Sequence, residues 1–167
     1  RGAAPGADRG GGAGGGGGRA ASLRAAADKP VRLTRESSSP QETEAAGAEL
    51  AGRLGPGDVV LVSGELGSGK TTFVRGACRA LGVEGPVTSP TFTVGHVLGG
   101  SLEVAHLDLY RLGSLAGEDP ALLDDYLTPD RVAFVEWPAV AEPSLERVAA
   151  RVLVEHLGGD RRRITIS

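Results

Sequence analysis

The sequence has very little of the residue types that build covalent or metal-bound frameworks. Its single cysteine, Cys78, excludes an internal disulfide network and favours a reducing compartment, so we predict a cytoplasmic protein. Cys78 shares a predicted helix face with Val74, Ala77 and Leu81, which favours core packing over catalysis. The three histidines lack metal-ligand spacing, and no apolar run approaches the ~20 residues of a membrane span. Neither a histidine- or cysteine-based metalloenzyme nor a membrane protein is indicated.

An excess of basic charge is also missing. The chain has 18 Lys and Arg residues against 21 Asp and Glu residues, for a net charge of -3. A domain that binds nucleic acid by itself carries a basic surface patch. If RNA is involved, we therefore expect a partner protein to hold it.

Large side chains are scarce at the N-terminus. Ten of the 27 glycines lie within the first 18 positions, a composition typical of a disordered tail. A targeting peptide is the alternative, but the segment has neither an apolar core nor a clear amphipathic stripe. We predict a disordered tail over residues 1–33 and one folded domain over residues 34–167. Because the sequence starts at Arg1 and contains no methionine, an upstream portion stays an open alternative.

One segment carries a specific nucleotide-binding pattern. Residues 64–71, GELGSGKT, match G-x-x-x-x-G-K-[ST] between an apolar strand-like run at 58–63 and a predicted helix over 71–81. The glycines allow main-chain N–H groups to turn toward phosphate oxygens, and the helix N-terminus adds partial positive charge. Lys70 is predicted to contact the β and γ phosphates, and the Thr71 hydroxyl to ligate magnesium. The pattern favours a nucleotide site over an ordinary glycine-rich turn.

The other patterns predict an α/β fold with a mixed sheet and the phosphate site at the strand ends. Ser39 to Glu42 form a capping box with Pro40 at the first helical position. In chain order after the phosphate loop and its helix, we predict a hairpin of 92–98 and 102–109, a short acidic helical region at 122–127, a strand at 132–136, and a hairpin of 152–157 and 162–166.

A triphosphate site also needs a second carboxylate for magnesium and a group that positions the attacking water. Two acids compete for the metal: Glu136 ends an apolar strand, and Asp108 lies in an alternating segment that points it inward. The segment 88–91, TSPT, carries hydroxyls on a proline-bounded loop. It fits a switch that senses the γ phosphate, with an ordinary turn as the alternative.

Four motifs together carry a family resemblance. GELGSGKTTFVRG, VTSPTFTV, HLDLYRL and VEWP occur in this order, and over residues 39–167 the chain resembles the TsaE (YjeE) family. That family is the ATPase component of the bacterial machinery that makes threonylcarbamoyladenosine in tRNA. The resemblance implies a small P-loop NTPase fold, magnesium-dependent ATP hydrolysis, and action on a complex of TsaB and TsaD. It implies contact with tRNA only through these partners.

The resemblance also assigns residues by position. It implies that Thr71 and Glu136 ligate Mg²⁺, with Asp108 close by as a water-orienting acid. With Lys70, these form the predicted catalytic set. The predicted ATP-binding set is Glu42, Thr43, Leu66, Gly67, Ser68, Gly69, Lys70, Thr71, Thr72 and Arg162.

Several of these assignments have alternatives. By the resemblance, Glu42 and Thr43 match a family stretch near the base and ribose. Arg162 lies where the family often keeps a basic residue near the nucleotide, with a solvated strand end in a run of three arginines as the alternative. Trp137 couples the nucleotide state to a partner surface or simply packs. Arg111 stabilises the transferred phosphoryl group or pairs with nearby acids.

Two parts of the chain depart from the family pattern, and two other functions stay open. The Gly-rich tail lies outside the pattern, and residues 139–150 carry no motif that aligns. A nucleotide-controlled interaction module without turnover shares every motif. A small-molecule kinase shares the phosphate loop, but about 130 residues leave little room for a lid and an acceptor pocket.

Overall fold

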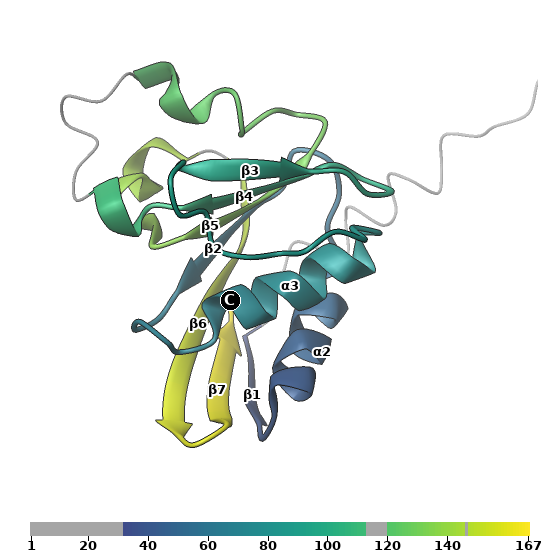
Figure 1. The fold of residues 1–167 in the computed structure, drawn as a ribbon, viewed down its shortest axis with the longest axis vertical. Coiled ribbons are helices and arrows are strands. Elements are labelled where there is room, and N and C mark those ends of the chain that lie inside the picture. Colours follow the sequence, from purple (N-terminus) through teal and green to yellow (C-terminus); the bar gives the residue numbers. More distant parts are fainter. Residues whose placement is uncertain (1–31, 113–119, 146) are drawn as a thin grey trace, which may run out of the picture. The chain divides into compact units, whose positions relative to one another are not determined.

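The computed structural model describes residues 32–112, 120–145 and 147–167. Within these residues, seven strands form one mixed sheet in the order β1-β7-β6-β2-β5-β4-β3 (Figure 1). The strands are β1 Leu33–Ser37, β2 Val59–Ser63, β3 Gly95–Leu98, β4 Val104–Asp108, β5 Val132–Glu136, β6 Val148–Gly158 and β7 Arg161–Ile166, and the α-helices are α2 Pro40–Ala51 and α3 Lys70–Ala80. Short 3₁₀ helices span Tyr110–Leu112, Pro120–Leu123, Pro138–Val140 and Glu142–Ser144.

The central strands are parallel, and the outer strands are antiparallel. β2 pairs in parallel with β5 and β6, and β4 pairs in parallel with β5. β3, β7 and β1 add antiparallel pairs at the two edges. Parallel strands end at the same sheet edge, so the ends of β2, β5 and β4 bring their last residues together.

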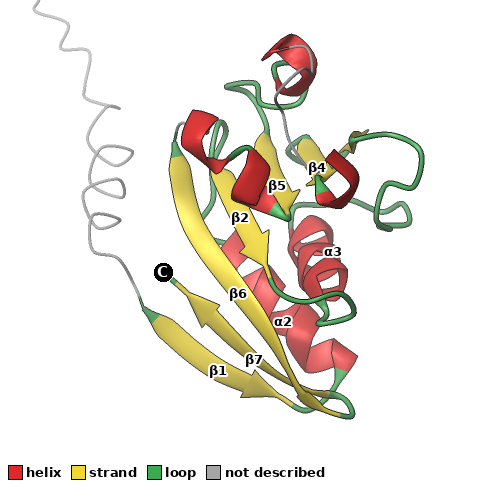
Figure 2. Ribbon diagram, turned by 90° about the vertical axis from the view of Figure 1, so that its left-hand side faces the viewer, coloured by secondary structure: helices red, strands yellow, loops and turns green. Residues whose placement is uncertain are grey.

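Side chains of the central strands alternate between two hydrophobic cores. Val60 and Val62 of β2 pack in the core that includes α2 and α3, whereas Val59 and Leu61 pack in a second core on the opposite face. Figure 2 shows α2 and α3 on one side of the sheet. Strands buried on both faces explain why β2 and β5 are continuous apolar runs.

Most of the predicted elements are confirmed. The capping box opens α2: the Ser39 hydroxyl accepts the Glu42 N–H at 3.2 Å, and the Glu42 carboxylate accepts the Ser38 N–H at 2.6 Å. The phosphate loop lies between strand β2 and helix α3, and both hairpins are present. The sheet is mixed, as predicted.

Four details differ from the sequence-based predictions. Strand β1 was not predicted; it is a polar edge strand that pairs with β7. β3 begins at Gly95 instead of residue 92, and Phe92 is 98% exposed. β6 begins at Val148 rather than 152, because its pairing with β2 starts there. The helical region predicted at 122–127 is a 3₁₀ turn over Pro120–Leu123.

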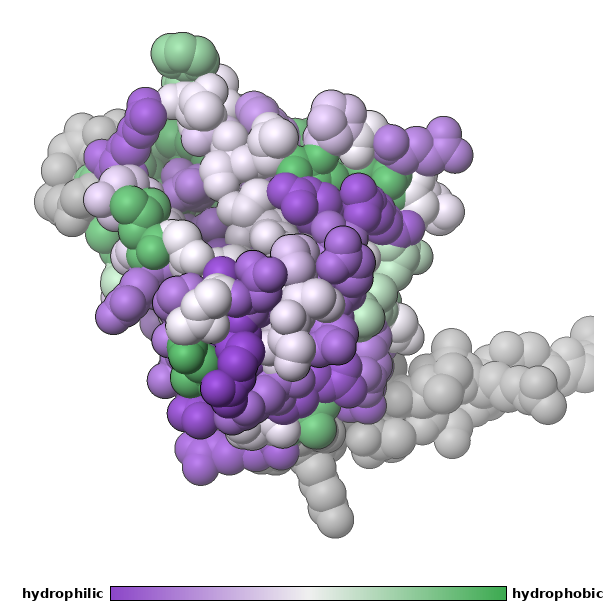
Figure 3. All heavy atoms as spheres, turned by 60° about the horizontal axis from the view of Figure 1, so that its bottom comes forward, coloured by the Kyte–Doolittle hydropathy of each residue, from purple (hydrophilic) through white to green (hydrophobic). Residues whose placement is uncertain are grey.

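The predicted tail and domain boundary fall mostly outside the described residues. Of residues 1–33, the structure describes only the last two, and Leu33 already belongs to β1. Among the described residues, no helix is both long enough and apolar enough to cross a bilayer. The face turned forward in Figure 3 is mostly hydrophilic, with hydrophobic residues in isolated spots.

Two glycines let α2 and α3 approach backbone to backbone. A Cβ on Gly76 would overlap the main chain of Glu44, and a Cβ on Gly47 would overlap the carbonyl oxygen of Phe73. Arg75 reinforces this contact with an ion pair to Glu44 at 3.4 Å. Because α3 starts at the phosphate loop, this close packing also fixes the position of the loop.

Substituting Gly76→Ala is expected to destabilise the protein by about 1–3 kcal/mol or more, because the new methyl group forces the two helices apart. The measurement is the free energy of unfolding in urea. Gly52→Ala is the matched control: Gly52 has φ -62°, and the nearest atom to an added Cβ is 3.6 Å away. Equal stability of the two variants would contradict the tight helix contact.

Candidate functional site

A loop of residues 64–69 connects the end of β2 to the start of α3. Three of its glycines have positive φ, at 145° for Gly64, 74° for Gly67 and 104° for Gly69, a conformation that favours glycine. Gly69 is the N-cap of α3, and among the described residues no side chain caps this helix end. The N-terminal N–H groups of α3 are therefore oriented to receive an anion.

The loop is seated tightly against β6. A Cβ on Gly64 would overlap the carbonyl oxygen of Val154 and lie 2.6 Å from the Ser68 hydroxyl. Ser68 is 0% exposed, and its hydroxyl has no hydrogen-bond partner among the described residues. An orphaned hydroxyl beside a helix N-terminus fits a ligand that supplies several oxygen acceptors, such as a phosphate chain.

Lys70 points back into its own loop. It is 4% exposed, and its Nζ donates to the carbonyl oxygens of Gly64 at 2.9 Å and Glu65 at 2.8 Å. The ammonium also lies 4.2 Å from the centroid of the Trp137 ring. Burial lowers the pKa of Lys70, while the charges of Glu136 and Asp108 oppose that shift. The lysine thus has a set of partners that a phosphate must replace.

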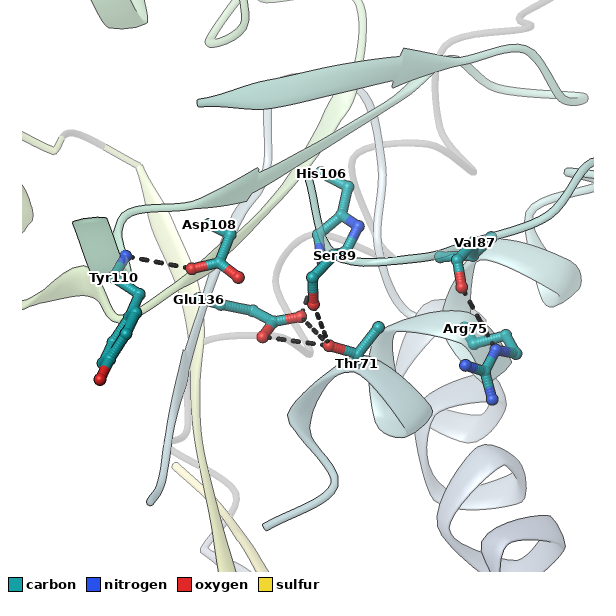
Figure 4. Close-up of polar contacts among 8 residues, drawn as sticks. All are labelled: Thr71, Arg75, Val87, Ser89, His106, Asp108, Tyr110 and Glu136. Atoms are coloured by element: carbon teal, nitrogen blue, oxygen red, sulfur yellow. Dashed lines mark hydrogen bonds and ion pairs between the residues drawn. The ribbon is translucent and has the colours of Figure 1, made fainter. Parts of the chain in front are cut away.

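Four polar side chains converge at the start of α3 (Figure 4). The Thr71 hydroxyl donates to Glu136 Oε1 at 2.9 Å, with Oε2 at 3.3 Å, and lies 2.7 Å from the Ser89 hydroxyl. His106 Nε2 lies 2.8 Å from the same Oε1. Since Thr71 donates its proton to Glu136, it accepts one from Ser89. The predicted switch loop is therefore hydrogen-bonded to Thr71, one of the two predicted metal ligands.

The structure separates the roles of the two candidate acids. Sheet register places Asp108 on β4 directly beside Glu136 on β5. Glu136 is 2% exposed and contacts Thr71, whereas Asp108 is partly exposed and its Oδ1 accepts the Tyr110 N–H at 3.0 Å. Of these two acids, Glu136 is the one that shares a hydrogen bond with Thr71. This geometry favours Glu136 over Asp108 as the partner of Thr71 in holding a cation.

The available donors fit a hard cation that takes most of its ligands from elsewhere. Thr71 and Glu136 offer a hydroxyl and a carboxylate, the oxygen ligands that Mg²⁺ prefers. In the part of the chain that the structure describes, no group of three or more His, Cys, Asp or Glu side chains could hold a metal. Magnesium in nucleotide sites is bound by one or two protein groups with phosphate oxygens and water, so these residues suit it.

The remaining predicted nucleotide-binding residues lie in two places: Leu66, Thr72 and Arg162 are at the phosphate loop or the start of α3, and Glu42 and Thr43 are at the start of α2. Arg162 of β7 lies beside the loop, where a Cβ on Gly69 would be 3.4 Å from its Nε. Glu42 and Thr43 instead build the N-terminal cap of α2, and Thr43 is 2% exposed with its hydroxyl 2.7 Å from that of Ser37. Leu66 is 75% exposed at the tip of the loop.

Trp137 and Arg111 connect the site to its surroundings. Trp137 has a left-handed backbone with φ 56°, and its ring lies 4.8 Å from that of Tyr110. The ring thus contacts Lys70 as well as packing on Tyr110. Arg111 donates to the carbonyl oxygen of Thr91 at 2.6 Å and forms no ion pair with the described acids. It is tied to the predicted switch loop instead.

A cleft of about 820 Å³ opens beside the phosphate loop. Its lining residues include Gly64, Glu65, Leu66, Tyr110, Trp137 and Leu153. Three of these, Gly64, Glu65 and Trp137, are the contacts of Lys70. The residues that hold Lys70 therefore form part of the wall of the cleft.

His106 is a site residue that the sequence analysis did not single out. It is 0% exposed on β4, on the same strand face as Asp108 two residues later. The two-residue spacing from Asp108 was the sequence signal that could have indicated His106 as a site residue. The contact with Glu136 depends on the pairing of β4 with β5, which the sequence pattern does not give.

Comparisons with known proteins support the family resemblance. A family model described as "Threonylcarbamoyl adenosine biosynthesis protein TsaE" matches residues 37–164. The Bacillus subtilis (strain 168) tRNA threonylcarbamoyladenosine biosynthesis protein TsaE is 37% identical over 129 residues, which cover 77% of this chain and 80% of the relative. A Streptomyces coelicolor protein of the same name is 41% identical over 117 residues, covering 68% of this chain and 79% of the relative. The crystal structure of Bacillus subtilis YdiB has a TM-score of 0.64 and 34% identity, and the match covers 81% of this chain and 84% of that one. The chain described here belongs to the TsaE family.

Proposed function

We propose that this protein is a magnesium-dependent ATPase that supports threonylcarbamoyladenosine modification of tRNA by binding and resetting a complex of TsaB and TsaD. The observation that carries the ATPase proposal is the hydrogen bond between Thr71 and Glu136 beside an uncapped helix N-terminus. The pathway follows from the family and from the names of the relatives. The partners TsaB and TsaD are part of the proposal and come from the family resemblance alone.

Binding of the phosphates is assigned to the loop and to Lys70. The N–H groups at the start of α3 and the Ser68 hydroxyl donate to phosphate oxygens. Lys70 moves from the carbonyl oxygens of Gly64 and Glu65 to the β and γ phosphates. The loop thereby exchanges internal hydrogen bonds for bonds to the nucleotide.

Hydrolysis is assigned to the acids at the sheet edge. Thr71 and Glu136 would hold Mg²⁺, which when bound would supply positive charge against the charge that develops on the phosphates. Asp108, next to Glu136 in the sheet and more exposed, orients the attacking water. This division gives each carboxylate one role and follows their different burial.

Communication with the partner complex is assigned to the segment 88–91. Its Ser89 hydroxyl bonds to Thr71, and its Thr91 carbonyl accepts a bond from Arg111. Binding of the γ phosphate with Mg²⁺ would engage the Thr71 hydroxyl and so disturb its bond to Ser89 of this segment. Loss of the γ phosphate reverses the change, so that hydrolysis resets the bound partner complex.

Phosphate release from ATP by the full chain, measured at fixed Mg²⁺ with and without TsaB and TsaD, tests the proposal. We expect a low basal rate that rises at least ~10-fold with both partners, because the switch segment is shared between the site and the partner surface. Tight ATP binding without turnover in either mixture would instead indicate a nucleotide-controlled interaction module. A phosphorylated small molecule as product would indicate a kinase.

Glu136→Gln is expected to lower turnover by ~100-fold or more while ATP affinity changes by less than ~5-fold, because the charge that holds magnesium is lost and the loop is retained. Lys70→Ala is the contrasting variant, for which we expect ATP affinity to fall by more than ~10-fold. Calorimetric ATP binding and steady-state turnover separate the two effects. Equal loss of binding in both variants would assign Glu136 a structural role.

Arg162→Ala is expected to weaken ATP binding by about 3–10-fold, because its guanidinium lies beside Gly69 of the phosphate loop. Arg163→Ala is the matched control, since Arg163 forms an exposed ion pair with Glu36 at 3.2 Å. Both affinities are measured by calorimetry at one salt concentration. An unchanged ATP affinity for Arg162→Ala would support the alternative interpretation, in which Arg162 is a solvated residue at a strand end.

A further inference from the structure

We propose that His106 is a positioning residue that orients the Glu136 carboxylate toward Thr71 and the magnesium ion. This inference rests on the proposed function, because it assigns a role within the same metal site. Its basis is the 2.8 Å contact between His106 Nε2 and Glu136 Oε1, with both side chains buried. Figure 4 shows His106, Glu136, Ser89 and Thr71 gathered at one point.

The chemistry of the contact fixes which ring nitrogen carries the proton. An ionised carboxylate only accepts hydrogen bonds, so Nε2 of His106 is the donor to Glu136. Nδ1 is buried and has no hydrogen-bond partner among the described residues. A neutral ring with the proton on Nε2 leaves only an unpaired acceptor at Nδ1, whereas the other tautomer would leave an unpaired N–H and oppose two acceptors.

The unpaired nitrogen argues against a role in packing alone. A buried polar atom without a partner lowers stability, and an apolar side chain at this place would avoid that cost. Two neighbours of His106 on the same face of the strands are apolar and 0% exposed, Val104 on β4 and Phe134 on β5, while the partly exposed Asp108 ends β4 on that face. The stabilising contact of the ring is therefore its bond to Glu136.

The bond leaves one oxygen of Glu136 available. Oε1 lies 2.9 Å from the Thr71 hydroxyl and 2.8 Å from His106, whereas Oε2 has only the longer 3.3 Å contact with Thr71. His106 is held rigidly because β4 is paired on both sides, with β3 and with β5. Glu136 ends its strand and has three rotatable side-chain bonds, so a fixed donor on Oε1 restricts the direction of Oε2.

Two substitutions separate the hydrogen bond from the shape of the ring. His106→Gln keeps an amide N–H near the position of Nε2, whereas His106→Asn places its amide near the position of Nδ1, too far back to reach Glu136. His96 lies on β3, is paired with His106 on β4 and is exposed, so His96→Gln is the matched control.

The test is a calorimetric titration of ADP into the full chain over a range of Mg²⁺ concentrations and in EDTA. Mg²⁺ is expected to increase ADP affinity, and we define the half-point as the Mg²⁺ concentration that gives half of this increase. We expect His106→Asn to raise the half-point by ~10-fold or more, while ADP affinity in EDTA stays within ~2-fold of that of the unsubstituted protein. His106→Gln and His96→Gln should stay within ~3-fold of the unsubstituted protein. A stability change alone would not separate magnesium dependence from metal-free affinity in this way.

The outcomes distinguish this inference from the proposed function. If ADP binding by the unsubstituted protein does not depend on Mg²⁺, the metal site and the inference both fail. If that dependence is present and His106→Asn leaves it unchanged, or if His106→Gln weakens it equally, only the inference is overturned. As a measurement that needs no substitution, ¹⁵N NMR of the histidine rings should show the Nε2–H tautomer for His106, and an Nδ1–H tautomer would overturn it.

Discussion

A carboxylate buried at the end of a parallel strand determines the arrangement of the groups around it. Glu136 is 2% exposed, and a buried charge is stable only where hydrogen-bond donors surround it. Those donors come from two other elements, Thr71 at the start of α3 and His106 on β4. They reach Glu136 because β2, β5 and β4 end at the same sheet edge and α3 follows β2 after a short loop. The strand order, the length of the phosphate loop and the start of α3 together place the hydrogen-bond donors around the Glu136 carboxylate.

The sequence predicts those parts of the fold whose pattern is local. The apolar run of β2, the capping box at Ser39 and the glycine-flanked hairpins each carry their own signal, and each is present. Strand β1 has no such signal, since its polar sequence is a strand only because β7 provides hydrogen-bonding partners. The alanine-rich start of β6 is similar: β2 decides where it begins. Pairing between distant segments is the information that the pattern lacks.

The same limit applies to the candidate site. The sequence predicts Lys70, Thr71 and Glu136 as site residues because the phosphate loop and the strand end are local motifs. The resemblance already prefers Glu136 to Asp108, and the distances to Thr71 add a geometric reason for that preference. The contact of His106 with Glu136 needs the pairing of β4 with β5. Glu42 and Thr43 show another limit: both make capping contacts at the start of α2. A sequence pattern does not distinguish capping residues from residues that contact a ligand, because both are polar.

The contacts of Lys70 have a consequence for how the proposed ATPase would bind ATP and release its product. Its ammonium donates to two carbonyl oxygens of its own loop and faces the Trp137 ring, so a phosphate competes with contacts that are already favourable. In the proposed ATPase, such competition would lower the affinity for ATP and for the product ADP, because the contacts of Lys70 stabilise the nucleotide-free state. Weaker binding of ADP would favour its release before the next round of hydrolysis. The contacts of Lys70 with its own loop and with Trp137 would thus limit nucleotide affinity while they ease product release.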